Sequence, residues 1–286
     1  MSLELSFTPA DQIGKIQRTI EESFAEAAKE ASWMNDVFKL PTPVYRNGKI
    51  HHVLKPPLLK NPGRSDIPIK DLLGDDPWMW LVAGPNGAGK KTFSRVFLKG
   101  ASPYPLLHLS PDGHAAMIRS HLSNKSWDDA LKIATQRIDE LVSLFVKQRQ
   151  SFLVETPLSS SKYQDAVLLA KKDGFQIGLV YISLPLADLL PARIHLRVQK
   201  GGHPVDPQKA KDSFARSLDQ LPWFAEQADF FMAFDNAAQS REPILVAMKK
   251  AGSPLVHKNS GINPKLDRAL KKIAPKRNKR NALVLS

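Results

Sequence analysis

The chain has 286 residues, 42% of them hydrophobic and 24% charged, which predicts one good-sized folded domain with appendages or two small domains. No cysteine is present, which excludes disulfides, thiolate catalysis and thiolate metal sites. The formal charge is +13, and neither a run of ~18 apolar residues nor a signal-peptide pattern occurs, so we expect a cytoplasmic protein without a membrane contact.

A helix is predicted near the N-terminus, where Thr8-Pro9-Ala10-Asp11 provides a hydroxyl cap, a first-turn proline and a first-turn acid. Apolar residues follow at steps of three and four, which places them on one face: Ile13, Ile16, Ile20, Phe24, Ala27, Ala31 and Met34. Prolines then forbid a long regular element before Pro77, except for a small hairpin around Asn47-Gly48. Residues 1–76 are therefore predicted to be a helical extension and a proline-rich connector.

Beyond Asp75, short apolar runs alternate with helical patterns. Each run has the length of a strand buried on both faces, and the intervals suit crossover helices. The runs are Trp78–Ala83, Leu106–Leu109, Phe152–Val154, Gln176–Ser183 and Phe230–Phe234. We predict an α/β fold over residues 77–252, with a parallel sheet flanked by helices.

A phosphate-binding motif follows the first of these strands. Gly84-Pro85-Asn86-Gly87-Ala88-Gly89-Lys90 satisfies G-x-x-x-x-G-K between a strand and a helical run, which is the context that the motif requires. Glycines let backbone N–H groups turn inward around phosphate oxygens, and the following helix points its positive end at the same charge. We expect this loop to bind ATP, with Lys90 reaching the β- and γ-phosphates.

The residue after the motif lysine departs from the pattern. Ser or Thr is expected there, because its hydroxyl binds the magnesium ion of the nucleotide, but the chain has Lys91 and a hydroxyl only at Thr92. Three readings stay open: Thr92 binds Mg²⁺ in a shifted geometry, Lys91 replaces part of the metal charge, or the site is impaired.

A basic tail is predicted at residues 253–286, with a short helix around Leu266–Ile273, and we expect the tail to be mobile. Nine Lys or Arg residues and one acid, Asp267, lie between Lys258 and Arg280, so this segment carries about +8 of the total charge. It has no aromatic residue on which a base could stack. A nonspecific, salt-sensitive polyanion contact is the simplest expectation, with a polynucleotide kinase or nucleic-acid binder as an alternative.

From Trp78 to about Asn236, the chain resembles the zeta-toxin family of P-loop kinases, in particular its short bacterial branch. The resemblance rests on ordered blocks, of which the Gly-Gly-His-x-Val block after two spaced arginines is the most specific. The blocks are Ala83–Lys90, Ser110-Pro111-Asp112, Phe152-Leu153-Val154-Glu155-Thr156, Arg193 and Arg197-Val198 with Gly201-Gly202-His203-Pro204-Val205, and Arg216-Ser217-Leu218. The resemblance implies an enzyme that uses ATP and Mg²⁺ to phosphorylate a hydroxyl of a nucleotide sugar such as UDP-N-acetylglucosamine. It also implies a toxin with an antitoxin partner.

The resemblance assigns roles to residues that also make chemical sense at strand ends. Asp112 matches the general base, although an aspartate there could also cap a helix. Glu155 and Thr156 match residues that hold the acceptor, and Glu155 could instead be a magnesium-associated carboxylate.

Two arginines, Arg193 and Arg197, are four residues apart, so on a helix they share a face and could converge on the transferred phosphate; a solvated basic face is the alternative. Arg216 is a further candidate for a phosphate or acceptor contact, and His203 receives no chemical role.

Departures from the family pattern leave a second function open. The chain has Glu155-Thr156-Pro157-Leu158-Ser159-Ser160 where Glu-Thr-Thr-Leu-Ser-Gly is common, and Lys211-Asp212-Ser213 where arginines are usual. Together with Lys91, these residues suit a catalytically impaired nucleotide-binding or interaction protein that kept the fold. Residues 1–76 could also act in cis, covering the nucleotide cleft as an attached antitoxin would.

Overall fold

The computed structural model describes residues 42–46, 49–53, 76–99, 107–122, 125–199, 205–237 and 243–273. The predicted N-terminal helix, the Gly201-Gly202-His203 block and residues 274–286 lie outside this part of the chain. In the described part, no helix is both long and apolar enough to cross a membrane.

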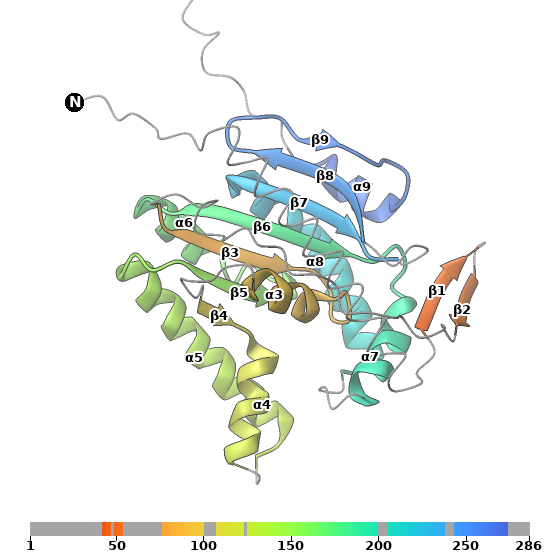
Figure 1. Cartoon of the computed structure of the whole chain (residues 1–286), viewed down its shortest axis with the longest axis horizontal. Helices are drawn as coiled ribbons and strands as arrows, with labels where there is room; N and C mark the ends of the chain where they lie inside the picture. The colour runs from red at the N-terminus through yellow and green to blue at the C-terminus, as the bar shows by residue number, and fades with distance from the viewer. Residues whose placement is uncertain are drawn as a thin grey trace, which may run out of the picture.

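A sheet of seven strands in the order β4-β5-β3-β6-β7-β8-β9 forms the centre of the described part (Figure 1). All five predicted strands are present and pair in parallel, which confirms the predicted α/β fold. They are β3 (Trp78–Ala83), β4 (Leu107–Leu109), β5 (Phe152–Thr156), β6 (Gln176–Ser183) and β7 (Phe230–Asp235). Every residue of β3, β5 and β7 is buried, as an apolar run covered on both faces requires.

Two antiparallel strands extend the sheet beyond the prediction. β8 (Ile244–Lys250) pairs with β7, and β9 (Val256–His257) pairs with β8. The run Ile-Leu-Val-Ala-Met in β8 is too short for its periodicity to distinguish a strand from a buried helix, so this strand was not predicted.

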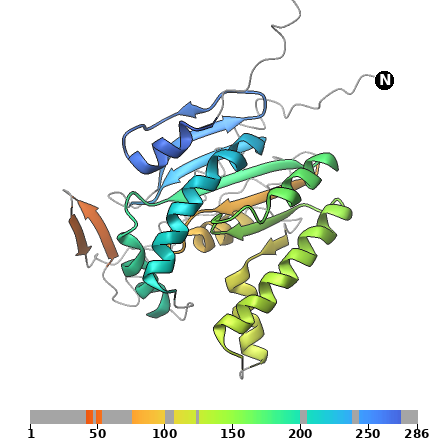
Figure 2. The same cartoon turned by 180° about the vertical axis from the view of Figure 1, so that it is seen from behind.

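Helices cover both faces of the sheet. The helix α3 (Lys90–Lys99) lies on the face seen in Figure 1, whereas α6 (Gln164–Lys172) and α8 (Pro207–Gln227) cross the opposite face, seen in Figure 2. The helices α4 (Pro111–His121) and α5 (Trp127–Lys147) pack on each other beyond the edge strand β4, and α7 (Leu189–Gln199) packs on α8.

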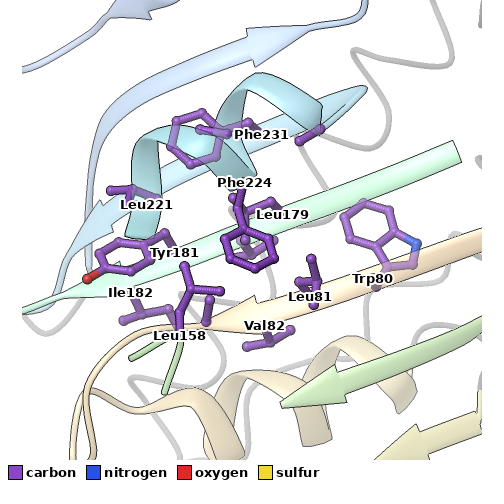
Figure 3. Close-up of a cluster of buried hydrophobic side chains, with 14 of the residues drawn as sticks. Trp80, Leu81, Val82, Leu158, Leu179, Tyr181, Ile182, Leu221, Phe224 and Phe231 are labelled. Atoms are coloured by element: carbon purple, nitrogen blue, oxygen red, sulfur yellow. The ribbon is translucent and has the colours of Figure 1, made fainter. Parts of the chain in front are cut away.

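Side chains from α8 and the sheet form the core on the rear face. Figure 3 shows Leu221 and Phe224 of α8 pointing at β6 and β3. Leu81, Leu179 and Phe231 share this face with Tyr181, whose hydroxyl is 3.0 Å from Ser217 Oγ of α8, and all four are fully buried. Trp80, Val82 and Ile182 are buried on the opposite face, and Leu158 is buried in the loop after β5. Burial of one such side chain stabilises a fold by about 1.5–3 kcal/mol, so this layer holds the strand ends in a fixed arrangement.

The predicted hairpin is also present. β1 (Thr42–Arg46) and β2 (Lys49–Val53) pair antiparallel, with Arg46 opposite Lys49. β1 contacts α7.

The boundary predicted at Gly252 is placed too early. Residues 253–273 contain β9 and α9 (Pro264–Leu270), which confirms the short helix. Leu266, Ala269 and Leu270 belong to the main core, and α9 packs on α8. This packing was not predicted because α9 has few apolar residues, and all of them are buried against an element distant in sequence.

Candidate functional site

The glycine-rich loop has the conformation of a phosphate cradle. It leaves β3 at Gly84, and α3 begins at Lys90. Gly84, Gly87 and Gly89 have φ angles of 132°, 82° and 107°, a region that residues with a Cβ rarely adopt. The loop therefore needs its glycines to hold this backbone, and it directs the N-terminal end of α3 toward the space above the sheet.

Close neighbours add a second reason for glycine in this loop. A Cβ on Gly84 would lie 2.0 Å from the Ile182 carbonyl oxygen of β6, and one on Gly89 would lie 2.9 Å from Asn236 Nδ2. The loop is thus pressed between the ends of neighbouring strands, which leaves its N–H groups fixed for an anion.

The motif lysine folds back over this loop. Lys90 Nζ donates hydrogen bonds to the carbonyl oxygens of Gly84 at 2.6 Å and Pro85 at 3.0 Å. Lys91 is exposed and Thr92 is half-buried on the first turn of α3. The side chain at the unexpected position 91 therefore points to solvent, while the residues of the cradle itself fit a triphosphate.

The first turn of α4 contains Asp112 at the carboxyl end of β4. Its N-cap is Ser110, whose hydroxyl accepts the Gly113 N–H, so Asp112 is not the capping residue. The capping role that the sequence left open for Asp112 therefore belongs to Ser110. The aspartate is half-buried and follows the carboxyl end of β4, the end of the parallel strands at which the cradle also lies.

Glu155 is the centre of a buried polar cluster next to the cradle. It lies beside Val82 of β3, and its side chain is 8% exposed. Its Oε1 is 2.8 Å from His108 Nε2, and its Oε2 accepts a hydrogen bond from Ser110 Oγ at 3.2 Å. Both carboxylate oxygens therefore have a fixed partner.

Charges and hydrogen bonds keep this carboxylate ionised. Burial alone would raise the pKa of Glu155, but the bond from His108, its charge, the Ser94 hydroxyl and the charge of Lys90 together lower it. The Ser94 Oγ is fully buried and has no hydrogen bond of good geometry, although it is close enough to influence Glu155. A buried, ionised and positioned carboxylate one strand from the phosphate cradle is suited to binding a hydroxyl group or a cation.

Thr156 and the loop after β5 are held by a local hydrogen bond. Leu158 N donates to Thr156 Oγ1 at 3.0 Å, and Leu158 has a φ of 54°, which is unusual for a residue with a branched side chain. Leu158 is 1% exposed, so its packing holds the strained turn. Thr156 keeps its hydroxyl hydrogen for another acceptor.

Arg193 contacts the loop after β7. Its Nη2 donates to the Asn236 carbonyl oxygen at 2.6 Å, and its Cβ lies 3.4 Å from the position of a Cβ on Gly87. Burial lowers the pKa of Arg193 to about 10, against the opposing charge of Asp235, so the guanidinium remains charged at neutral pH. In this structure Arg193 supports the cradle from the side of β7.

The remaining predicted residues are less defined. Arg197 is on α7, but its side chain lies outside the described residues. Arg216 is exposed on α8. Their roles stay predictions.

Sequence reasoning missed several polar residues at this end of the sheet. His108 interrupts the apolar strand Leu-His-Leu, and Asp235 and Asn236 follow a run of apolar residues at the end of β7. The rule that selected Glu155, a polar residue at the carboxyl end of a buried strand, also applies to Asp235. Asn263, which comes from the C-terminal segment, carried only the signal of a helix cap before a proline.

Comparisons with known proteins agree with this geometry. A family model described as AAA domain matches residues 79–221, and no curated protein matches the chain. The solved AvrRxo1-ORF1:AvrRxo1-ORF2 complex with sulphate ions is similar at 17% identity and a TM-score of 0.53, over 72% of this chain and 66% of that chain. The same pair with ATP gives 14% identity and a TM-score of 0.54, over 93% and 74%.

A structure from the PezAT chromosomal toxin-antitoxin system of Streptococcus pneumoniae covers 60% of this chain and 72% of that chain, at 17% identity and a TM-score of 0.44. The chain spans 66%, just under two thirds, of the length of the neighbour in the AvrRxo1 complex with sulphate ions. At such identities the likeness concerns the fold alone. With about half of its length matched by the model, and with a phosphate cradle at the end of a central parallel strand, this chain belongs to the AAA domain family and has a P-loop kinase-like fold.

Proposed function

We propose that the chain is an ATP-dependent kinase of the zeta-toxin type, which phosphorylates a hydroxyl of a nucleotide sugar such as UDP-N-acetylglucosamine. The observation that carries the proposal is the position of Glu155, a buried carboxylate held by His108 and Ser110 on the strand next to the glycine cradle. Burial of a carboxylate costs free energy, so its fixed position beside the cradle supports a role in binding a ligand, here the acceptor hydroxyl.

The proposed reaction uses the residues as follows. Lys90 leaves its carbonyl partners to contact the β- and γ-phosphates, and Asp112 accepts the proton of the attacking hydroxyl. The new bond joins the acceptor oxygen to the γ-phosphorus, while the bond from that phosphorus to ADP breaks. Glu155 and Thr156 orient the acceptor, and Arg193 and Arg197 compensate the charge that spreads over the transferred group.

The proposed metal ion is Mg²⁺ bound together with ATP. The described residues contain no group of three or more His, Cys, Asp or Glu that could hold a metal by themselves. Mg²⁺ in kinases takes most of its ligands from phosphates and water and needs one or two protein oxygens. Thr92 is the residue that we expect to supply one, and Glu155 is the alternative ligand if it does not hold the acceptor. When bound, the ion would neutralise phosphate charge.

We further propose a cytoplasmic toxin that is held inactive by an antitoxin. The support is the resemblance of the motifs to zeta toxins, together with a structure of similar fold in which AvrRxo1-ORF1 is in complex with AvrRxo1-ORF2. Residues 1–76 are the candidate for a covering segment in cis, and Arg216 is the candidate for a further acceptor contact.

Phosphoryl transfer from labelled ATP is the direct test. The full chain is incubated with ATP, Mg²⁺ and a panel of nucleotide sugars, with Lys90→Ala and Asp112→Ala as controls. We expect a labelled nucleotide sugar from the wild type, none from Lys90→Ala, and a loss of about 10²–10⁴-fold in rate from Asp112→Ala at unchanged ATP affinity. Binding of ATP without transfer to any acceptor would contradict the proposal.

One observation favours a second function, that of an impaired enzyme that binds nucleotide. Lys91 stands where a Mg²⁺-binding hydroxyl is expected, and it is exposed. The variant Lys91→Ser distinguishes the two functions. A rise in transfer rate would identify position 91 as the limit on turnover, whereas no transfer from either protein would favour the binding function.

A further inference from the structure

A chain of buried polar contacts joins the C-terminal helix α9 to the phosphate cradle. It begins at Asn263, the N-cap of α9, which has no exposed surface. The Asn263 side chain accepts the Leu266 N–H at 3.0 Å and donates to Asp235 Oδ2 at 2.6 Å and to Ser183 Oγ at 3.2 Å. One amide thus caps α9 and binds the carboxyl ends of β6 and β7.

The residue directly after β7 holds the cradle. Asn236 Nδ2 donates to the Ala88 carbonyl oxygen at 2.7 Å, and the Asn236 carbonyl oxygen accepts from Arg193. The Asn236 N–H donates to the Ser183 carbonyl oxygen at 2.9 Å. Asn236 is therefore fixed from β6, and it bonds to the loop between two of its glycines.

Asp235 is 1% exposed, so its ionised form costs free energy in this position. Burial raises its pKa, and the donors that favour its ionised form are the Ala237 N–H at 2.9 Å and Asn263, helped by the charge of Arg193. Loss of a donor to a buried carboxylate forces the group to move or to take up a proton. A displaced Asp235 would also displace Asn236, because the two residues are adjacent.

We infer that Asn263 is a positioning residue for ATP: through Asp235 it holds Asn236, and Asn236 holds the phosphate cradle at Ala88. The segment that provides it follows residues 79–221, the part that the family model matches. The inference rests on the nucleotide-binding part of the proposed function and requires no particular acceptor.

Two substitutions at position 263 separate this role from helix capping. Asn263→Ser keeps a good N-cap but is too short to reach Asp235, and Asn263→Asp keeps a good N-cap but sets a second carboxylate against the first. If Asn263 only capped α9, both variants would bind nucleotide like the wild type. We expect Asn263→Ser to raise the Kd for ATP about tenfold and Asn263→Asp to raise it further.

A matched control and a double variant complete the experiment. Leu266→Ala removes a fully buried side chain of the same helix without touching Asp235, so it should lower the melting temperature more than Asn263→Ser while changing the Kd for ATP less than about twofold. Asn236→Ala should itself weaken ATP binding, and adding Asn263→Ser to it should have no further effect, because both act on one contact. Isothermal titration with a non-hydrolysable ATP analogue and thermal unfolding of the full chain give both readouts.

The results test the role of Asn263 and the kinase proposal separately. Wild-type affinity in both position-263 variants, or an affinity loss in Leu266→Ala that matches its stability loss, would overturn the inference. If Asn263→Asp does not fold, Asn263→Ser alone carries the comparison. A chain that binds ATP but transfers nothing would end the kinase proposal and leave this inference to the measured affinities; a chain that binds no ATP would end both.

Discussion

Replacing Gly84 by alanine tests the claim that the cradle is pressed against the sheet. Gly84 has a φ of 132°, and a Cβ there would lie 2.0 Å from the carbonyl oxygen of Ile182. Gly261 offers a matched control, because its φ is 89° and a Cβ there would meet nothing within 4 Å. The two positions thus share an unusual backbone and differ in the space around them.

The expected cost follows from these two terms. Alanine at Gly261 should cost only the conformational strain, about 1–2 kcal/mol. Alanine at Gly84 adds a clash with main-chain atoms of β6, which cannot rotate away as a side chain could, so about 1–3 kcal/mol more is expected. Because Ile182 and Gly84 are both at the nucleotide end of the sheet, Gly84→Ala should also abolish ATP binding, whereas Gly261→Ala should leave it intact.

Urea unfolding followed by circular dichroism gives the free energy of unfolding, and calorimetric titration gives the affinity for ATP. The reasoning is refuted if Gly84→Ala unfolds at the same urea concentration as Gly261→Ala, or if it binds ATP normally. Equal slopes of the unfolding curves are required for the comparison, since a changed slope would mean a changed denatured state.

Three more outcomes are expected from the described contacts. His108→Ala should raise the KM for the acceptor about tenfold and leave the KM for ATP unchanged, and His108→Gln should recover much of the loss because its amide can donate to Glu155. Equal acceptor KM values for His108→Ala and wild type would contradict the role of this bond. Because its pKa is lowered in the folded state, Glu155 stabilises the fold at pH values above the ordinary carboxyl pKa of about 4.3. The difference in unfolding free energy between wild type and Glu155→Gln should therefore be constant near neutral pH and shrink as the pH falls below that value. A difference that grows in acid would contradict the lowered pKa. Gly178→Ala would place a Cβ 2.3 Å from the ring of the fully buried Trp80, so it should cost about 1–3 kcal/mol in urea unfolding, and a fall in that cost when Trp80 is also changed to leucine would locate the clash.

Local signals in the sequence were sufficient for most of the parallel sheet. The run Trp78–Ala83 is uniformly apolar and is followed at once by the glycine motif, so strand, loop and helix start were all predictable from neighbouring residues. The same holds for Glu155, which is marked by its place at the end of an apolar strand. The antiparallel strand β8 had no such mark, because its residues suit a short strand and a buried helix alike.

Partners across the fold could not be predicted in this way. The sequence left Asp112 as either a base or a helix cap, and the distance of Ser110 Oγ from the Gly113 N–H settled which residue is the cap. Arg193 and Arg197 were paired by their spacing, yet Arg193 bonds to the backbone of Asn236, far along the chain. Spacing of four residues fixes a shared helix face but does not determine what that face contacts.

The sequence by itself determined the fold class, the phosphate loop and the strand that contains Glu155. Each of these features depends on residues that are neighbours in the sequence or on the apolar pattern of a single strand. Only the tertiary structure decided what surrounds them: that His108 and Ser110 hold Glu155, and that Asn263 reaches Asp235 beside the cradle. These contacts join residues from different strands and helices, and a displacement of a few tenths of an ångström is enough to weaken their hydrogen bonds. Such distances are set when the whole core packs, and no local pattern encodes them.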